Sequence, residues 1–427
     1  MATGVPRSPI RSTEESHPIA LTYPGKKEVA EILERPPGVF EMIRRGTGDV
    51  DNRLYFAENG SVLAHLARDD RMKGKVRLVY IDPPFATQSI FHSRKLSYAY
   101  EDVFECYRYL EFIRERLVQI HELLAQDGSI YLHLDAKMIF HAKIIMDEIF
   151  GSKNFRNCIT RKKSNPKNYT RNQYGNISDY ILFYTKSDRY VWNKPVEPWT
   201  EARAKEYQYV DPITGRRFMK VPVHAPGIRE GETGQPWRGV RPPMGKHWQY
   251  PPSTLEDMDK RGEISWSKTG NPRRKVWLDE SIGVSVQDIW LDYRDAHNQM
   301  IPISGYPTEK NINLLSRIIE ASSHPGDIIL DCFAGSGTTL VAANMLGRTW
   351  IGVDNSPEAI RTMLYRFEHG TEAMGDFMGR QIAQKKIHNA LLHKENIKIT
   401  DFSVYVDPNL EPYQSHNQDH IDYRNES

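Results

Sequence analysis

The sequence contains little cysteine: Cys106, Cys158 and Cys332 are the only three among its 427 residues. Three scattered cysteines are too few for a disulfide framework or a structural zinc site. None of them follows a proline, the position at which familiar enzymes that attack the ring carbon of cytosine carry their thiolate. The sequence therefore excludes a disulfide-stapled scaffold, argues against catalysis by a cysteine thiolate, and predicts no metal site.

Long apolar runs are also missing. No stretch reaches the roughly eighteen consecutive apolar residues that a membrane-spanning helix needs. Residues Met1 to Glu15 contain no apolar core of a secretory signal. We therefore expect a soluble cytoplasmic protein that does not associate with a membrane.

The net charge is only +2, but it is unevenly distributed. Residues 155–275 hold 24 Lys and Arg against 12 Asp and Glu, so this segment carries +12 and the remainder −10. Seven of the eight tryptophans lie in this segment or just after it. A basic, aromatic segment interrupted by proline and glycine is typical of a nucleic-acid contact surface. The alternative is a solvated insertion with a small aromatic core of its own.

Six arginines of this segment are candidates for contacts with bases or phosphates. They are Arg216, Arg217, Arg238, Arg241, Arg273 and Arg274. The chain is long enough for one large domain with a substantial insertion, or for two or three domains.

A short apolar run from Val76 to Ile81 has the length expected for a strand that is buried on both faces. It ends at Asp82-Pro83-Pro84-Phe85, where two prolines cannot donate to a ladder, so the chain must leave the sheet. Asp82 then lies at the carboxyl end of the strand, the edge at which open α/β sheets bind ligands.

This tetrapeptide suits chemistry on the exocyclic amine of a nucleobase. A carboxylate and a backbone carbonyl that accept the two N–H bonds would draw the nitrogen toward a tetrahedral geometry, while the ring of Phe85 stacks on the extruded base. The alternative is an ordinary Pro-Pro loop after a core strand.

Helical and strand patterns alternate after this tetrapeptide. Apolar residues recur at helical spacing from Leu110 to Leu124, and we expect the helix to stop at Asp127-Gly128 with glycine in a left-handed cap. A strand over 129–134 and a helix over 136–150 follow. This rhythm predicts parallel crossover units and hence an α/β fold.

A second strand, over 327–331, leads into Gly335-Ser336-Gly337 at the start of a helix. Such a turn lets the backbone approach a ligand closely. Asp354, at the tip of the following strand, is placed to accept both ribose hydroxyls of a nucleoside. A P-loop is disfavoured because no Gly-Lys-Ser/Thr follows. Leu340 stands where a dinucleotide site requires a third glycine, so S-adenosylmethionine, which carries no phosphate, fits better than a dinucleotide.

Upstream, Thr308 and Lys310 precede a predicted helix. A helix amino terminus favours anions, so both residues are candidates for contact with the carboxylate of the cofactor. The alternative is a plain helix start.

Taken in order, the motifs Asp82–Phe85, Tyr306–Lys310 and Asp331–Thr339 resemble those of the β-order amino-methyltransferases of bacteria and phages. The most similar are adenine-specific enzymes such as the modification subunits of type III restriction systems. The resemblance implies an α/β fold, namely the circularly permuted seven-stranded S-adenosylmethionine-dependent methyltransferase (Rossmann-like) fold with an inserted target-recognition region. The implied organisation is a catalytic half at 30–186, the insertion at 187–300, a cofactor half at 301–395 and a tail at 396–427. Residues 1–29 are polar and without periodicity, so we expect a mobile N-terminal arm there.

The resemblance also implies residue roles. The catalytic residues would be Asp82, Pro83, Pro84 and Phe85, which hold and activate the target amine. The residues expected around S-adenosylmethionine are Thr308, Lys310, Asp331, Phe333, Ala334, Gly335, Ser336, Gly337, Thr338, Asp354 and Asn355. The sequence departs from the pattern at Phe85, where tyrosine is commonest, and at Cys332 and Asn311, where proline is frequent.

The activity that follows from the resemblance is base-flipping methylation of adenine N6 in double-stranded DNA, by a protein associated with the nucleoid. Cytosine-N4 methylation is chemically equivalent and stays open. The sequence is also compatible with a catalytically silent DNA-binding relative and with a small-molecule methyltransferase. A homodimer and a restriction subunit are further partners to consider, although the chain is shorter than typical type III subunits.

Overall fold

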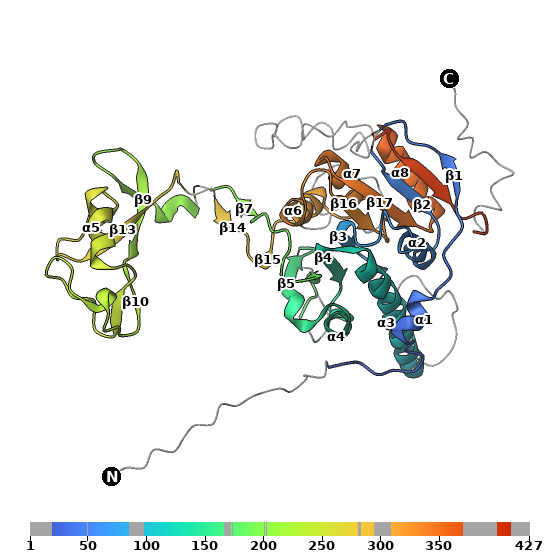
Figure 1. Cartoon of the computed structure of the whole chain (residues 1–427), viewed down its shortest axis with the longest axis horizontal. Coiled ribbons are helices and arrows are strands. Elements are labelled where there is room, and N and C mark those ends of the chain that lie inside the picture. Colours follow the sequence, from blue (N-terminus) through green and yellow to red (C-terminus); the bar gives the residue numbers. More distant parts are fainter. Residues whose placement is uncertain are drawn as a thin grey trace, which may run out of the picture. The chain divides into compact units, whose positions relative to one another are not determined.

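The computed structural model describes residues 19–48, 50–84, 98–165, 172, 174–199, 201, 203–280, 283–293, 309–369 and 399–410. The chain divides into two compact units, each of which is described by itself. Unit 1 comprises Met1–Asn193 and Gln287–Ser427, and unit 2 comprises Lys194–Val286 (Figure 1). Within the described residues, no helix is long and apolar enough to cross a membrane.

Unit 1 contains one large sheet in the order β1-β18-β2-β17-β16-β3-β4-β6-β5-β15. The strands are β1 (Glu41–Arg44), β18 (Ser403–Val406), β2 (Arg53–Phe56), β17 (Thr349–Asp354), β16 (Ile328–Asp331), β3 (Val76–Ile81), β4 (Leu124–Leu134), β6 (Ser178–Thr185), β5 (Phe155–Lys162) and β15 (Ile289–Trp290). Neighbours from β18 to β4 are parallel. Strand β6 runs antiparallel to both β4 and β5.

The order of the strands confirms the predicted fold. Strands β16 and β17, from the second half of the chain, lie between β2 and β3 of the first half. The seven strands β2-β17-β16-β3-β4-β6-β5 thus form one continuous sheet although the chain enters it in a permuted order. Crossover helices connect the parallel strands, as expected for a doubly wound α/β domain.

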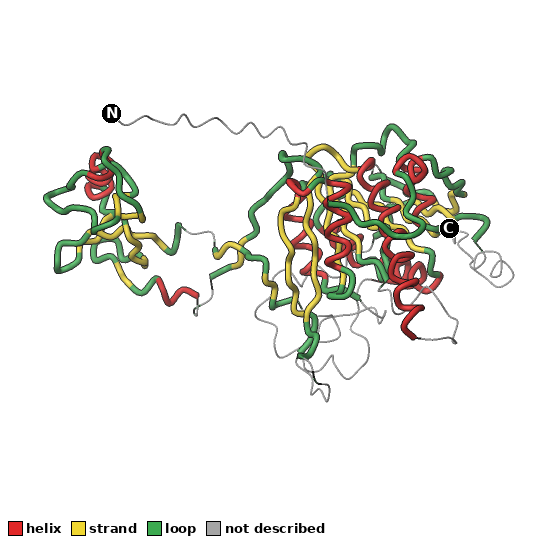
Figure 2. Tube along the Cα trace, turned by 90° about the horizontal axis from the view of Figure 1, so that it is seen from below, coloured by secondary structure: helices red, strands yellow, loops and turns green. Residues whose placement is uncertain are grey.

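Helices cover both faces of this sheet (Figures 1 and 2). The helices of unit 1 are α1 (Val29–Leu33), α2 (Asn59–Leu66), α3 (Tyr98–Leu123), α4 (Ile139–Phe150), α6 (Ile312–Ser322), α7 (Thr338–Met345) and α8 (Pro357–His369), with a 3₁₀ turn η1 (Ser152–Asn154). Alternate residues such as Val79, Ile81 and Leu132 pack with α2, α3 and α4 in the main core. Their neighbours on β3 and β4, among them Tyr80, point to the opposite face.

The predicted end of the long helix is wrong. Helix α3 ends at Leu123 and strand β4 begins at Leu124, because Leu124 already pairs with Val76 in the parallel ladder. Gly128 therefore lies within a strand rather than at a helix cap, and it is not among the glycines with positive φ. The predicted strand over Val76–Ile81 is confirmed as β3.

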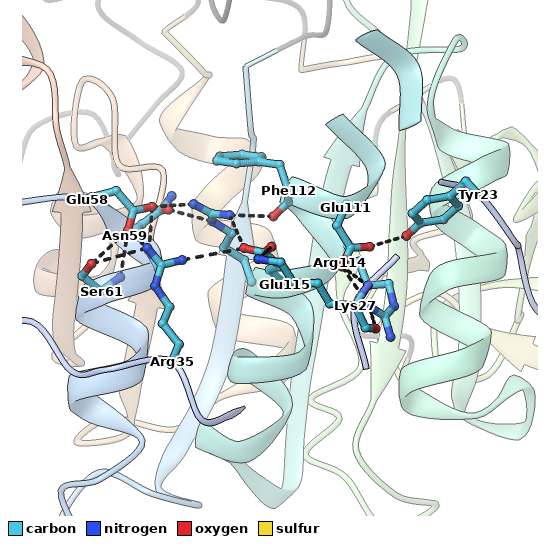
Figure 3. Close-up of polar contacts among 12 residues, drawn as sticks. Tyr23, Lys27, Arg35, Glu58, Asn59, Ser61, Glu111, Phe112, Arg114 and Glu115 are labelled. Atoms are coloured by element: carbon cyan, nitrogen blue, oxygen red, sulfur yellow. Dashed lines mark hydrogen bonds and ion pairs between the residues drawn. The ribbon is translucent and has the colours of Figure 1, made fainter. Parts of the chain in front are cut away.

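The described part of the predicted N-terminal arm contacts the helices of unit 1. The hydroxyl of Tyr23 donates to Glu111 of α3 at 2.7 Å, and Lys26 forms an ion pair with Glu148 of α4 at 2.7 Å. Figure 3 shows the contacts of Tyr23 and Lys27 with α3. This segment is therefore held against unit 1.

Unit 2 is built from short antiparallel strands. Its main sheet has the order β12-β13-β9-β8, and two further pairs are β10-β11 and β14-β7. The elements are β7 (Val196–Glu197), η2 (Arg203–Glu206), β8 (Tyr209–Val210), β9 (Arg217–Pro222), β10 (His224–Pro226), η3 (Glu232–Gly234), β11 (Lys246–Trp248), α5 (Pro252–Lys260), β12 (Ile264–Trp266), β13 (Pro272–Trp277) and β14 (Val284–Ser285).

Tryptophans form much of the core of unit 2. Trp237 and Trp248 are buried with Val223, Leu255 and Ile264, and the two indole rings meet edge to face at 6.4 Å. For these tryptophans the structure agrees with the alternative interpretation of the basic segment, in which aromatic residues pack in a small core of their own.

The basic charge is shared between the units. Unit 2 holds 16 Lys and Arg against 12 Asp and Glu, a net +4, whereas residues 155–193 of unit 1 hold 8 against 2, a net +6. The insertion alone thus accounts for only part of the predicted basic segment.

Candidate functional site

The predicted catalytic and cofactor motifs lie side by side at one edge of the sheet. Strands β3 and β16 are adjacent and parallel, with Val79 opposite Leu330, so Asp82 and Asp331 both stand at the carboxyl ends of neighbouring strands. A cavity of about 670 Å³ opens at this edge. Its lining residues are Ala57, Glu58, Asn59, Tyr80, Asp82, Pro84, Phe112, Arg116, Lys310, Asp331, Cys332, Phe333, Ala334, Gly335, Ser336, Thr338, Thr339, Asp354, Asn355 and Ser356.

Most of the predicted site residues of unit 1 therefore share one hollow. Pro83 and Gly337 belong to the same loops but do not line the cavity. Phe85 and Thr308 lie outside the described residues, so their expected roles stay predictions.

Asp82 forms an ion pair with Lys310 through Oδ2. The sequence pattern assigned Lys310 to the cofactor, whereas its ammonium group contacts the predicted catalytic carboxylate. The other oxygen, Oδ1, is buried and has no hydrogen-bond partner among the described residues. A buried acceptor without a partner is costly, and this one lines a cavity. Asp82 therefore offers a ready acceptor to a donor that enters the hollow.

The glycine turn is shaped by two left-handed residues. Gly335 has a φ of 53° and Gly337 a φ of 74°. Residues with a Cβ rarely adopt such positive values. A Cβ on Gly337 would lie 2.7 Å from Cγ of Met363 in α8. The turn is thus folded tightly against α8, and its backbone faces the cavity.

Asp354 holds the glycine turn in place. Its Oδ2 accepts from the backbone N–H of Gly335 at 2.8 Å, and its Oδ1 accepts from that of Ser356 at 2.9 Å. Burial raises the pKa of Asp354, and these amides act in the opposite direction. Because each carboxylate oxygen has a second lone pair, the residue keeps acceptor capacity toward the cavity that it lines.

Asp331 is the most strongly perturbed acid of the site. It is 3% exposed, and its Oδ1 accepts from the backbone N–H of Phe333 at 3.0 Å. Burial raises its pKa to about 7, with smaller increases from the charges of Asp82 and Asp354. A carboxyl that titrates near neutral pH inside a cavity is typical of a ligand site.

A buried ion pair supports the glycine turn from behind. Arg366 of α8 lies 3.0 Å from Glu309, and both side chains are almost fully buried. The same guanidinium donates to Thr338 Oγ1 at 3.0 Å and to the carbonyl of Ser336 at 3.3 Å. Sequence reasoning missed Arg366, which lies on the buried face of α8 with Ala359, Met363 and Phe367, where an apolar residue is expected.

A second missed group lines the cavity on the side of α2 and α3. Glu58 accepts from the backbone N–H groups of Gly60 and Ser61 and caps α2. Arg116 of α3 forms an ion pair with Glu58, donates to Asn59 at 2.9 Å and stacks on the ring of Phe112. Figure 3 shows Glu58, Asn59 and Phe112 in this cluster. The spacing of these residues in the sequence gives no sign that they meet.

The six candidate arginines all lie in unit 2 and differ in their contacts. Arg216 pairs with Asp279 and Glu280, and Arg238 pairs with Glu256 and Asp259. Arg217 donates to the backbone carbonyls of Ala204 and Tyr207, and Arg274 donates to the Tyr250 hydroxyl.

Arg241 and Arg273 are the remaining two. Both side chains are exposed. Within the described part of the chain, neither side chain forms a hydrogen bond or an ion pair. Their guanidinium groups are therefore open to solvent. The described residues contain no group of three or more His, Cys, Asp and Glu side chains placed to hold a metal ion.

Comparison with known proteins identifies similar sequences. The chain matches the family model N6_N4_Mtase, described as DNA methylase, over residues 76–365. It is 42% identical over 399 residues to the type II methyltransferase M.EcaI of Enterobacter cloacae. The alignment covers 91% of this chain and 87% of that protein. It is 27% identical over 367 residues to the EcoP15I Mod subunit of Escherichia coli. That alignment covers 67% of this chain and 54% of the Mod subunit.

Solved structures give weaker matches. The PvuII DNA methyltransferase (cytosine-N4-specific) superposes with a TM-score of 0.44 at 14% identity, over 84% of this chain and 100% of that one. The M1.HpyAVI–SAM complex gives a TM-score of 0.38 at 17% identity, over 74% and 98%. Because both scores are low, the fold assignment comes from the strand order and the family match.

Proposed function

Since the chain belongs to the N6/N4 family of DNA methylases, we propose that it methylates the exocyclic N6 of adenine in double-stranded DNA after flipping the base out of the duplex. The observation that carries this proposal is the buried, open acceptor Oδ1 of Asp82 at the cavity. An aspartate at the head of the tetrapeptide favours adenine. Cytosine-N4 methylation is the second candidate, because the family covers both amines.

S-adenosylmethionine is the methyl donor, and it supplies a methyl group that its sulfonium already activates. The residues around the cavity suit this molecule. The turn over Gly335 and Ser336 lets a ligand approach the backbone, Asp354 faces the cavity with spare acceptor capacity, and Asp331 offers a carboxyl group to an ammonium.

Asp82 has two tasks in this proposal. Its Oδ1 accepts an N–H bond of the target amine and orients the nitrogen lone pair toward the methyl group. As the N–C bond forms, the bond from the sulfonium sulfur to the methyl carbon would break with its electron pair going to sulfur. The methylated nitrogen would then carry a positive charge and lose a proton, which the same carboxylate would receive. Lys310 contacts the other carboxylate oxygen, Oδ2, and so fixes the orientation of the Asp82 side chain.

Mass analysis of nucleosides tests the proposed target. DNA incubated with the protein and S-adenosylmethionine is digested and its methylated nucleosides are weighed. We expect N6-methyladenine. N4-methylcytosine would replace the adenine assignment by the second candidate, and the absence of any methylated nucleoside would identify a silent DNA-binding relative.

Cofactor binding should depend on pH through Asp331. Since its pKa is raised to about 7 by burial, the free site is protonated below that pH, and an ammonium group binds the carboxylate form. The affinity for S-adenosylhomocysteine should therefore rise with pH, by at most about tenfold per pH unit, and level off above pH 7. Calorimetry in two buffers with different ionisation enthalpies measures the proton released on binding.

The matched control is Asp331→Asn, which cannot release a proton. This variant should bind more weakly and lose the dependence on pH and buffer. An unchanged proton release in the variant would mean that another group titrates on binding, and Asp331 would then have no role at the ammonium.

We also propose that unit 2 recognises the target sequence. In the order of the chain, it follows strand β3, which leads to Asp82, and precedes strand β16, which leads to the glycine turn. Arg241 and Arg273 are exposed on it. Replacing both by Gln should reduce the slope of log affinity against log salt by about 2, since each phosphate contact contributes about 0.9.

Arg238→Gln is the control for this measurement, because Arg238 is already paired with Glu256 and Asp259. Its salt slope should equal that of the unmodified protein. Equal slopes for the double variant and the control would remove Arg241 and Arg273 from the DNA interface.

A further inference from the structure

A row of buried polar side chains crosses one face of the sheet behind Asp82. Its members are Tyr80 of β3, His133 of β4, Asp179 of β6 and Arg161 of β5, and none is more than 2% exposed. The ladder places them on the same face, since Tyr80 is opposite Tyr131, His133 is opposite Ile181 and Asp179 is opposite Arg161. We refer to these four residues as the polar row.

Each member of the polar row contacts the next. The Tyr80 hydroxyl lies 2.7 Å from His133 Nδ1, and His133 Nε2 lies 3.0 Å from Asp179 Oδ2. Arg161 donates to both oxygens of Asp179, at 2.8 and 2.5 Å, and to the carbonyl of Tyr293 at 3.1 Å. Apolar residues in such a row would be as stabilising or more so, so stability alone does not account for the row.

The row determines which nitrogen of His133 carries a hydrogen. Burial raises the pKa of Asp179, but the ion pair with Arg161 acts in the opposite direction, and the resulting pKa lies below its ordinary value, so Asp179 is a carboxylate. Asp179 can only accept and lies 3.0 Å from Nε2, so the ring tautomer with its hydrogen on Nε2 leaves the lone pair of Nδ1 for the Tyr80 hydroxyl. The Tyr80 hydroxyl then donates its hydrogen to Nδ1.

This arrangement matters because Asp82 lies close to the same ring. Asp82 Oδ1 is 3.9 Å from His133 Nδ1, and Tyr80 and Asp82 project from the same side of the chain two residues apart. Burial raises the pKa of Tyr80 well above its ordinary value, and the charge of Asp82 contributes to the rise. The phenol is therefore a protonated donor that lies near an open acceptor.

We propose that His133 and Asp179 are positioning residues that hold the hydroxyl of Tyr80 away from Asp82, so that Oδ1 stays open to the target amine. Without the lone pair of Nδ1, the hydroxyl would be free to turn to Oδ1, a buried acceptor that lies 3.9 Å from that nitrogen, and would occupy the position that the amine needs. The inference rests on the proposed role of Asp82.

A double-mutant cycle tests the inference. His133→Leu should lower kcat at least tenfold, with the dissociation constant of S-adenosylhomocysteine and the KM for DNA within about twofold of the unmodified values. Tyr80→Phe should keep kcat within about threefold, because it removes only the competing donor. Adding Tyr80→Phe to His133→Leu should restore kcat to within about threefold of Tyr80→Phe alone.

A purely structural role predicts the opposite pattern, in which the double variant is as slow as His133→Leu or slower. Tyr131→Phe is the matched control, since this buried hydroxyl on the same face bonds Ser322 rather than a residue of the row. A tenfold or greater loss of kcat in Tyr80→Phe would also overturn the inference. This outcome can be measured even if neither His133→Leu nor His133→Met folds. Methyl transfer by Asp82→Asn at the rate of the unmodified protein would instead refute the proposed role of Asp82 itself.

Discussion

Replacing Asp82 by Asn should slow methyl transfer about 10²–10³-fold, the loss typical of removing one preorganised polar group from a reacting centre. The variant keeps one acceptor oxygen but loses the charge that Lys310 contacts and the base that receives the proton. Binding of S-adenosylhomocysteine should stay within about twofold, because the residues of the glycine turn are untouched. Single-turnover transfer of labelled methyl measures the rate, and calorimetry measures the binding.

Asp135→Asn provides the control. Asp135 follows the neighbouring strand β4 and accepts from the backbone N–H groups of Lys137 and Met138, but it does not line the cavity. Its methyl-transfer rate should stay close to that of the unmodified protein. If Asp82→Asn transfers methyl as fast as this control, the carboxylate has no part in the chemistry.

Replacing Arg366 by Met should lower the free energy of unfolding by about 3–5 kcal/mol, the range for removing one partner of a buried ion pair. Glu309 would stay buried without the guanidinium at 3.0 Å, and the glycine turn would lose the donors to Ser336 and Thr338. Affinity for the cofactor should therefore fall as well. Denaturant unfolding followed by fluorescence measures the first effect.

Glu309→Leu combined with Arg366→Met separates the two effects. The double variant removes the buried charge and should regain much of the lost stability, while affinity for the cofactor stays low because the turn still lacks its donors. A double variant that binds the cofactor normally would show that Arg366 acts only through Glu309.

The elements that carry the two motifs were predictable from local sequence. The apolar run from Val76 to Ile81 ends at two prolines, and the run from Ile328 to Asp331 is followed by the glycine turn. Both strands form as predicted. These signals are local, because a residue that cannot donate to a ladder or that favours positive φ marks a strand end by itself.

The side-chain partners in the cavity could not be predicted from the same patterns. Lys310 and Asp82 are 228 positions apart, and Arg116 and Glu58 are 58 apart. Contacts of this kind depend on strand register, and no periodicity in the sequence reports them. Likewise, the charge count of unit 2 gave no sign that Arg216 and Arg238 pair with its own acids.

The most direct test of the account is a structure of the protein bound to its DNA target and S-adenosylhomocysteine. We expect a purine outside the helical stack, with its exocyclic nitrogen within hydrogen-bond distance of Asp82 Oδ1 and the cofactor sulfur on the side of Gly335. A target base that stays paired, or a cofactor bound away from the cavity between β3 and β16, would contradict the account.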